Sequence, residues 1–165
     1  AKDAIGREHQ VATIQLDMNM PDRFDLYCIN EKGEQERIVM IHAAIMGSIE
    51  RFMSVLIEHT AGAFPTWLSP TQVTIVPVRE NHNDEAKKVY DMLKANNIRV
   101  ELADSDESLG KRINHAKAEK VPYVIVLGDK EVESKMLTIE GRESKTEMTA
   151  QDFLSKLKEE IQNKK

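Results

Sequence analysis

An unbroken apolar run from Tyr123 to Leu127 limits the possible folds of this chain more than any other segment. Five such residues in a row are typical of a strand buried on both faces, as in parallel sheets that helices cover on either side. A shorter apolar strand is expected at Val73, Ile75 and Val76. Segments with helical spacing separate these runs, so the sequence predicts an α/β domain in which strands and helices alternate.

The other elements of this domain follow from apolar spacing and from capping residues. Asn83 is expected to cap the first helix, and the T-x-x-D pattern of Thr149 and Asp152 is expected to begin the last one. Gly128 and Asp129 are interpreted as a turn. Three apolar sets predict the helices: Ala86, Val89, Tyr90 and Leu93; Leu109, Ile113 and Ala116; Phe153, Leu157 and Ile161. Two more strands are expected at Ile98, Val100 and Leu102 and at 136–139, giving a three-layer α/β/α domain with a mixed, mainly parallel sheet.

The first part of the chain has a different pattern. Val11 to Leu16 alternates as a strand, and Phe24 to Ile29 and Ile38 to Ile41 are expected to pair as a hairpin through NEKGEQE. An amphipathic helix follows, with one apolar stripe formed by Ile45, Ile49, Phe52 and Leu56.

A connector from Ala61 to Gln72 contains Gly62, Pro65 and Pro70, which end the helix and favour an extended chain. Trp67 and Leu68 are interpreted as an apolar anchor between two domains. The sequence therefore predicts domains at 1–68 and 69–165.

Composition excludes several classes of function. The 165 residues carry a net charge of −5, which argues against general affinity for nucleic acid, and Cys28 is the single cysteine, which excludes an internal disulfide. No apolar run approaches the length of a membrane span, and the N-terminus lacks a signal-peptide pattern, so we expect a cytoplasmic protein with no membrane association. A Gly-rich phosphate loop and a G-x-S-x-G nucleophile motif are both missing from the sequence.

Two single residues and one charged stretch are the candidate functional features. Arg51 has no acidic helical neighbour, although a lone Arg on a helix is most often simply solvated. His42 is by itself too little for a zinc site. In the stretch 104–120, a carboxylate such as Glu107 can accept from a guanine edge while Lys111 and Arg112 hold phosphate. The same charges also suit an ordinary helix dipole.

Longer segments resemble a known family. IHAAIMGSIERF followed by EHTAGAFPTWLSPTQV, together with VATIQL and DSDESLGKRINHAKAEKVPYVIVLGDKEVE, is similar to the bacterial threonyl-tRNA synthetases. The resemblance covers almost the whole chain and corresponds to the end of a class II catalytic domain, with its antiparallel strands and final motif helix, plus an anticodon-binding domain. It implies a threonine–tRNA ligase that is a homodimer and uses threonine, ATP and tRNA in protein synthesis, with no DNA partner.

The resemblance also implies roles for individual residues. Arg51 would contact the ATP phosphates beside Ser48, while Gln10, Thr13 and Gln15 would surround the adenylate. His9 and Ala12 stand where the family usually has Trp and Gly. His42 would be one of three zinc ligands, the other two lying upstream of this chain, and Ala43 replaces a common Arg. The parent would use Zn²⁺ and Mg²⁺/ATP, whereas the isolated fragment is expected to bind neither and to be inactive.

For the second domain the resemblance implies anticodon binding through Glu107, Lys111 and Arg112. Asp106 and Asn114 stand where arginines are common, which makes the basic surface thinner than usual. The alternative hypothesis is a non-catalytic RNA- or protein-binding module derived from a synthetase C-terminus.

Overall fold

The computed structural model describes residues 1–103 and 106–165, and the chain divides into two compact units, Ala1–Thr60 and Ala61–Lys165. This division lies ahead of the sequence boundary at 68/69, because hydrogen bonds join the connector to later residues of the chain. Arg142 Nη1 donates to the Phe64 carbonyl at 2.6 Å, and Gln72 Nε2 donates to the Thr66 carbonyl at 2.8 Å. The connector therefore belongs to the second unit.

The second unit contains a five-stranded sheet in the order β6-β5-β7-β8-β9. Strand β5 is parallel to both β6 and β7, whereas β8 is antiparallel to β7 and to β9. Four of the five strands thus run in one direction, which confirms a mixed, mainly parallel sheet. The elements are β5 (Val73–Pro77), η1 (Glu80–His82), α3 (Asn83–Ala95), β6 (Val100–Leu102), α4 (Leu109–Ala118), β7 (Tyr123–Leu127), α5 (Asp129–Ser134), β8 (Leu137–Gly141), β9 (Lys145–Met148) and α6 (Ala150–Gln162).

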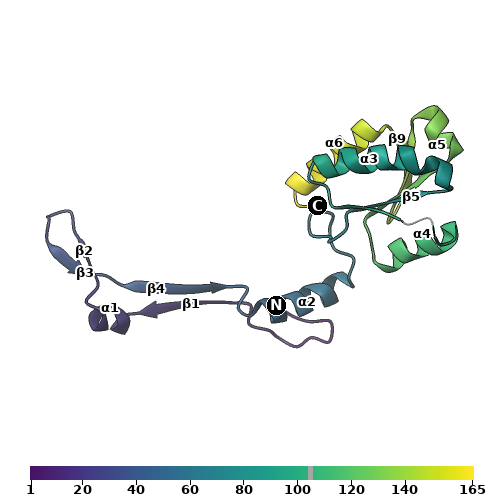
Figure 1. Ribbon diagram of the computed structural model, residues 1–165. Helices are drawn as coiled ribbons and strands as arrows, with labels where there is room; N and C mark the ends of the chain where they lie inside the picture. The colour runs from purple at the N-terminus through teal and green to yellow at the C-terminus, as the bar shows by residue number, and fades with distance from the viewer. Residues whose placement is uncertain (104–105) are drawn as a thin grey trace. The chain divides into compact units, whose positions relative to one another are not determined.

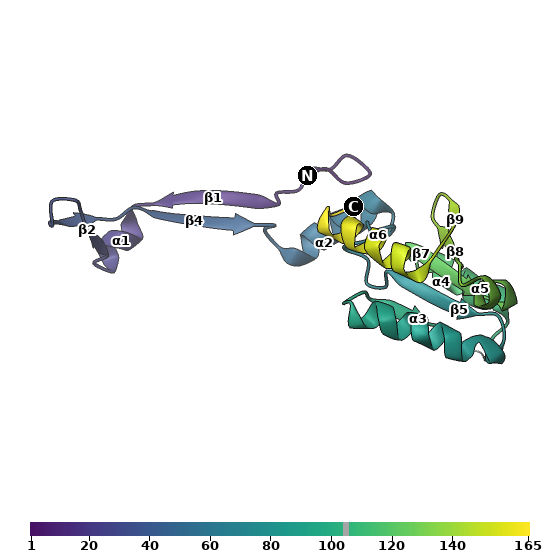
Figure 2. The same ribbon diagram turned by 90° about the horizontal axis from the view of Figure 1, so that it is seen from above.

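Helices cover the two faces of this sheet unequally (Figures 1 and 2). Helices α3 and α6 lie on one face over the larger core, which includes Ile75, Leu93, Ile125 and Phe153. Helix α4 lies on the other face over a smaller cluster formed by Val76, Ala116, Val121 and Val124. Alternate residues of β5 and β7 enter the two clusters, so both strands are buried on both faces. The three-layer prediction is confirmed.

Several local predictions are corrected. Asp129 begins helix α5 instead of completing a turn, because Glu131 accepts from the Gly128 amide at 2.9 Å and closes a first helical turn. Strand β9 was not expected, since Lys145–Met148 has little apolar character. Asn83 is the first residue of α3, and His82 occupies the cap position. The capping prediction for α6 is confirmed, because Thr149 Oγ1 accepts from the Asp152 amide at 3.1 Å.

A buried polar network holds the connector at the start of β5. Gln72 is fully buried, and its Oε1 accepts from the Arg99 amide at 3.0 Å. The Arg99 guanidinium donates in turn to the carbonyls of Ser69 at 2.9 Å and Trp67 at 2.8 Å. Trp67 itself is only half-buried and Leu68 is exposed, so within this unit hydrogen bonds hold the connector more than an apolar anchor does.

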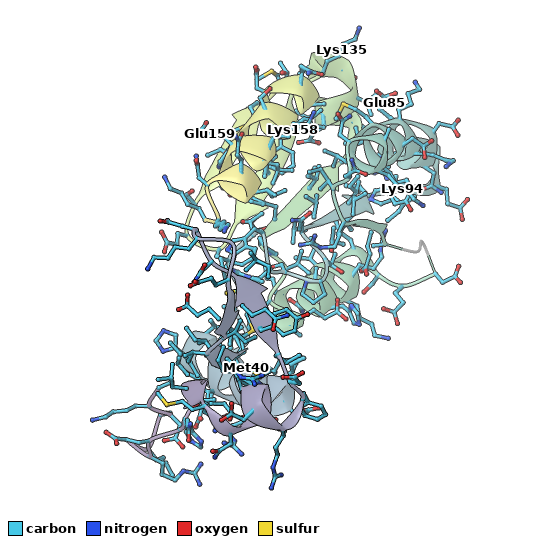
Figure 3. The ribbon with its side chains drawn as sticks, turned by 90° about the vertical axis from the view of Figure 1, so that its left-hand side faces the viewer. Met40, Glu85, Lys94, Lys135, Lys158 and Glu159 are labelled. Atoms are coloured by element: carbon cyan, nitrogen blue, oxygen red, sulfur yellow. The ribbon has the colours of Figure 1, made fainter. Side chains whose placement is uncertain are left out.

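Helix α6 closes the larger core and is tied to its neighbours by polar side chains. Glu160 accepts from Tyr123 Oη at 2.7 Å and from Thr66 Oγ1 at 3.1 Å. Burial and then the hydrogen bond to Glu160 raise the pKa of Tyr123 well above its ordinary value. Lys158, labelled on α6 in Figure 3, donates to Asn96 Oδ1 at 2.7 Å just beyond the end of α3.

The first unit consists of two antiparallel strand pairs and two helices. Its elements are β1 (Ala12–Asp17), α1 (Asn19–Arg23), β2 (Tyr27–Ile29), β3 (Gln35–Arg37), β4 (Met40–Ile45) and α2 (Ile49–Thr60). Strands β2 and β3 form the hairpin, while β4 pairs with β1 along its whole length (Figure 1). Cys28 lies in β2 as a strand residue.

Two predicted element boundaries in this unit were wrong. The segment Ile38–Ile41 does not complete the hairpin, because its second half belongs to β4 and pairs with β1. Ile45 is the last residue of β4 and 82% exposed, so it is not on the apolar stripe of the helix. Met46 and Gly47 have φ of 69° and 58°, a left-handed conformation that separates strand from helix.

The connector network gives the first prediction. Replacing Gln72 by Ala leaves the Arg99 amide and the Thr66 carbonyl without this partner, which should cost roughly 1–3 kcal/mol for each group stranded. Urea unfolding of the chain measures this loss for the second unit. Gln151→Ala, at an exposed position of α6, is the control and should change the free energy of unfolding by less than about 0.5 kcal/mol. Equal effects from both variants would contradict the role of the network.

Candidate functional site

One face of the β1–β4 ribbon collects polar side chains. The register places Thr13 opposite Ala44 and Gln15 opposite His42. Directly opposed residues of an antiparallel pair lie on the same face, so Thr13, Gln15 and His42 share one surface. Gln15 and His42 are exposed and Thr13 is partly exposed. His42 lies inside β4, not at its end as the sequence suggested, and this is what brings it level with Gln15.

The other face of the same ribbon is apolar and open. Ala12, Ile14 and Leu16 oppose Ile45, Ala43 and Ile41. The four larger side chains are highly exposed, at 79% for Ile14, 61% for Leu16, 66% for Ile41 and 82% for Ile45. The ribbon therefore separates a polar surface from an apolar one.

The remaining predicted residues of the first unit gather at one end of the ribbon. A Cβ added to Gly47 would lie 3.4 Å from the Gln10 carbonyl oxygen, so the backbone before α2 lies close to the start of β1. Ser48 directly precedes α2, donates to Glu50 at 2.7 Å and accepts from the Arg51 amide at 3.4 Å. Its hydrogen bond lowers the pKa of Glu50. Arg51 is exposed in the first turn of α2 and has no ion pair among the described residues.

A buried carboxylate that sequence reasoning missed orders the segment before β1. The Asp3 side chain is 1% exposed and accepts from Arg7 Nε at 2.6 Å and from the Arg7 amide at 2.8 Å. His9 Nε2 lies 3.0 Å from the same carboxylate. These hydrogen bonds, with that of His9 the largest, hold the pKa of Asp3 well below its usual range. The only sequence signal was the D-x-x-x-R-x-H spacing, which is weak.

His42 does not belong to a metal-binding cluster in the part of the chain that the structure describes. Across residues 1–103 and 106–165, no group of three or more His, Cys, Asp or Glu side chains is placed to hold a metal ion. A zinc site at His42 would require ligands from outside the residues described.

The predicted residues of α4 are divided between the surface and the interior. Glu107 and Lys111 are exposed and form an ion pair one helical turn apart. Arg112 is 7% exposed, and its Nη1 donates to the Pro77 carbonyl at 2.7 Å. Arg112 therefore faces inward with Ala116, one turn later on the same helix face, and this burial does not favour the predicted phosphate contact.

Acids neutralise the basic surface of α4 further along. Lys117 Nζ lies 2.6 Å from Glu140, and His115 lies 3.7 Å from Glu119. Asp106 and Asn114 are exposed, so the substitutions noted in the sequence do affect the surface. Asp104, the first residue of the predicted stretch, lies outside the described residues.

The loops after β5 and β7 are joined by a histidine that the sequence did not single out. His82 is 2% exposed and its Nδ1 accepts from the Arg79 amide at 3.2 Å. The ring proton is therefore on Nε2, which donates to Asp129 at 2.9 Å. This hydrogen bond is the main cause of the lowered pKa of Asp129. The contact fixes the carboxyl ends of two adjacent parallel strands.

Comparison with protein families divides the chain in the same way as the fold. The family model described as "Anticodon binding domain" matches residues 72–160. The model described as "tRNA synthetase class II core domain (G, H, P, S and T)" matches residues 2–60. No helix among the described residues is long and apolar enough to cross a membrane.

Curated relatives match along the whole chain. The threonine–tRNA ligase of Clostridium botulinum (strain Hall) is 48% identical over 165 residues, which is 99% of this chain and 26% of that protein. The threonine–tRNA ligases of Sulfurihydrogenibium sp. (strain YO3AOP1) and Thermotoga neapolitana are 47% and 46% identical, again with 99% and 26% coverage. The chain thus spans about a quarter of the length of these relatives.

Solved structures agree with the fold. The RNA-binding domain of threonyl-tRNA synthetase from Cryptosporidium parvum superposes with a TM-score of 0.88 at 33% identity, covering 96% of this chain and 41% of that one. Prolyl-tRNA synthetase from the same organism gives a TM-score of 0.71 at 22% identity, covering 93% and 34%, which supports the fold alone. The chain belongs to the anticodon-binding domain family, and the residues ahead of this domain match the model of the class II tRNA synthetase core domain.

Proposed function

We propose that this chain is the C-terminal part of a threonine–tRNA ligase, in which the second unit binds the anticodon stem-loop of tRNA and the first contributes the last catalytic motif. The observation that carries the proposal is the 46–48% identity to threonine–tRNA ligases over 99% of the chain. The parent would join threonine to its tRNA with ATP, as a homodimer in the cytoplasm.

The polar face of the β1–β4 ribbon supports the catalytic part of the proposal. Thr13 and Gln15 present hydroxyl and amide groups that can hydrogen-bond the adenylate, and Gln10 and Ser48 lie at the end of the ribbon nearest α2. Arg51 is in the first turn of α2, where the helix dipole also favours an anion. An exposed guanidinium with no acid paired to it among the described residues suits the phosphate oxygens of Mg²⁺-bound ATP.

The apolar face of the ribbon indicates that the catalytic core is larger than this first unit. A two-stranded ribbon is marginally stable without a covering layer, and an exposed surface such as Ile14, Leu16, Ile41 and Ile45 normally packs against other protein. We infer that further parts of the core cover it in the parent. The isolated chain would then neither form an adenylate nor charge tRNA.

His42 would supply one ligand of a zinc site in the parent. A neutral imidazole suits Zn²⁺, and a bound zinc ion would coordinate the threonine substrate as a Lewis acid. The two further ligands would come from outside this chain, so no metal binding is expected of the chain by itself.

Glu107 and Lys111 are the candidates for RNA contact in the second unit. They lie at the start of α4, close to the carboxyl ends of parallel strands β5 and β6, where ligands bind in α/β sheets. Glu107 can accept from a guanine edge, and Lys111 can neutralise a phosphate once their ion pair opens. The pairing of acids with the α4 cations predicts weak binding that is strongest at low salt.

A non-catalytic binding module remains the second candidate. The residues that favour it are Ala43 and Asn114, which stand where arginines are common in the family, and His9, which contacts Asp3 where the family usually has Trp. Such a module would bind RNA or a protein partner without needing the upstream core.

The anticodon proposal predicts different effects for two neighbouring residues. Glu107→Gln should reduce the preference for a threonine anticodon stem-loop over a base-substituted loop by about 1–3 kcal/mol, because it removes one acceptor for a base edge. Lys111→Ala should weaken binding of all loops alike and lower the salt slope by about one. Fluorescence anisotropy across a salt series measures both.

Matched controls exist on α3, where Lys87 and Asp91 form a pair with the same spacing on the other side of the sheet. Lys87→Ala and Asp91→Asn should leave RNA binding unchanged. If all four variants behave alike, or if no loop binds at low salt, the second unit does not read the anticodon through α4.

The catalytic proposal is tested in the longer protein that carries this chain. Arg51→Ala should lower ATP–pyrophosphate exchange about 10²- to 10³-fold, the effect of removing one preorganised group that stabilises transition-state charge. Arg23→Ala, an exposed arginine of α1, should keep exchange within about twofold. Full activity of the Arg51 variant would exclude a role for this residue in ATP chemistry.

A further inference from the structure

Helix α4 lies on the sheet face opposite α3 and α6 (Figure 1). Residues of α4 help to line a pocket of about 300 Å³. Thr74 of β5, Leu102 of β6 and Arg112 of α4 line it, and its remaining walls include three glutamates. We call it the Thr74–Arg112 pocket. Its volume is at the lower end of the range for small-molecule sites.

Two buried polar atoms of this pocket have no hydrogen-bond partner in the part of the chain that the structure describes. They are Thr74 Oγ1 and Arg112 Nε, on residues that are 6% and 7% exposed. An unsatisfied buried polar group is costly, and native proteins seldom retain one without a bound group that satisfies it. The two residues that carry these atoms line the same pocket, so one ligand there would be close to both.

The guanidinium of Arg112 favours an anion at this position. Its Nη1 is bonded to the Pro77 carbonyl at 2.7 Å, and none of the described carboxylates lies within ion-pair distance of the guanidinium. A buried guanidinium without a paired acid is strongly unfavourable, and its Nε–H edge is suited to a carboxylate oxygen. The hydroxyl of Thr74 can donate to the same carboxylate.

Carboxylates surround the pocket, in contrast to its cationic interior. Glu101, Glu107 and Glu119 all line it, and each is exposed. Lys111 pairs with Glu107, and His115 lies 3.7 Å from Glu119, so the rim keeps an excess of negative charge. Such a rim repels phosphates and the RNA backbone, whereas it attracts an ammonium group.

We propose that the Thr74–Arg112 pocket binds a free α-amino acid as its zwitterion. The carboxylate accepts from Arg112 Nε–H and Thr74 Oγ1–H, and the ammonium donates to the glutamates of the rim. The ligand required here differs from the one proposed for Glu107 and Lys111. The pocket needs a small molecule that carries both a carboxylate and an ammonium group, whereas Glu107 and Lys111 would contact RNA. The amino-acid proposal does not depend on whether the second unit binds an anticodon.

The test uses the complete chain and a panel of probes, by calorimetry and by amide chemical shifts. Glycine, L-alanine, L-threonine and L-leucine are compared with N-acetyl-L-alanine, which lacks the ammonium, and with ethylamine, which lacks the carboxylate. At least one zwitterion should bind and shift the amides of Thr74 and Glu119. Both single-charge analogues should bind at least about tenfold more weakly, the loss of a charge-assisted hydrogen bond.

Two variants isolate the pocket. Thr74→Val keeps the side-chain shape and removes a hydroxyl that no described residue partners, so it should fold and bind about fivefold to tenfold more weakly. Glu119→Gln should weaken binding by a similar factor. Glu159→Gln is the control, since Glu159 is exposed on α6 on the other side of the sheet (Figure 3).

The proposal is overturned by any of three results. The first is no shift at Thr74 or Glu119 with 10 mM of any amino acid, a concentration of about 10⁻² M that corresponds to under 3 kcal/mol of affinity. The second is equal binding of the zwitterions and the single-charge analogues. The third is unchanged binding by Thr74→Val. Binding of guanosine to the pocket in place of amino acids would overturn it as well.

Discussion

Strand β5 is buried on both faces and hydrogen-bonded along both edges, and this burial positions most of the second unit. A strand paired with parallel neighbours on each side leaves no edge free, and its side chains enter both cores. Other parts of the second unit are hydrogen-bonded to the two ends of β5. Gln72 ties the connector to the beginning of the strand, and the Pro77 carbonyl at its end receives Arg112 of α4. Helix α4, beside the RNA candidates, is thus positioned by a backbone atom of β5.

The first unit depends on a simpler rule, the alternation of side chains along a strand. Because β1 and β4 pair without a bulge, every apolar residue of β1 faces an apolar residue of β4. A shift of one residue would place Ile41 and Ile45 of β4 on the face of Thr13 and Gln15. The polar surface and the apolar surface are thus produced by one register, and the same register brings His42 opposite Gln15. The polar face and the apolar face of the ribbon therefore depend on the same strand pairing, so neither can change without the other.

Charge on α4 is arranged around one buried guanidinium. Arg112 uses its position inside the sheet–helix layer to hold the helix, while the exposed cations Lys111 and Lys117 are each engaged by a glutamate. Long-range attraction for RNA is therefore small, and base-edge contacts must supply more of any specificity. Arg112 Nε and the Thr74 hydroxyl, which no described residue partners, lie under a rim of carboxylates, and a zwitterion therefore suits the pocket better than a polyanion.

Local pattern was sufficient for the strands β5 and β7, for the helices α3, α4 and α6 and for the Thr149 cap, because burial on both faces and helical spacing leave a direct trace in residue order. It failed for α5 and β9, whose stability comes from Glu131 capping and from pairing with β8.

The site residues also fall into two groups, those that the sequence identified and those that only the folded chain revealed. Glu107 could be named from residue type and charge, whereas Thr13, Gln15, His42 and Arg51 were given roles only by the resemblance to the synthetase family. The folded chain was needed to show that Arg112 is internal, that His42 faces the same way as Gln15, and that Thr74 lines the same pocket as Arg112. These facts could not be predicted because pairing register and helix rotation depend on contacts between residues far apart in the chain.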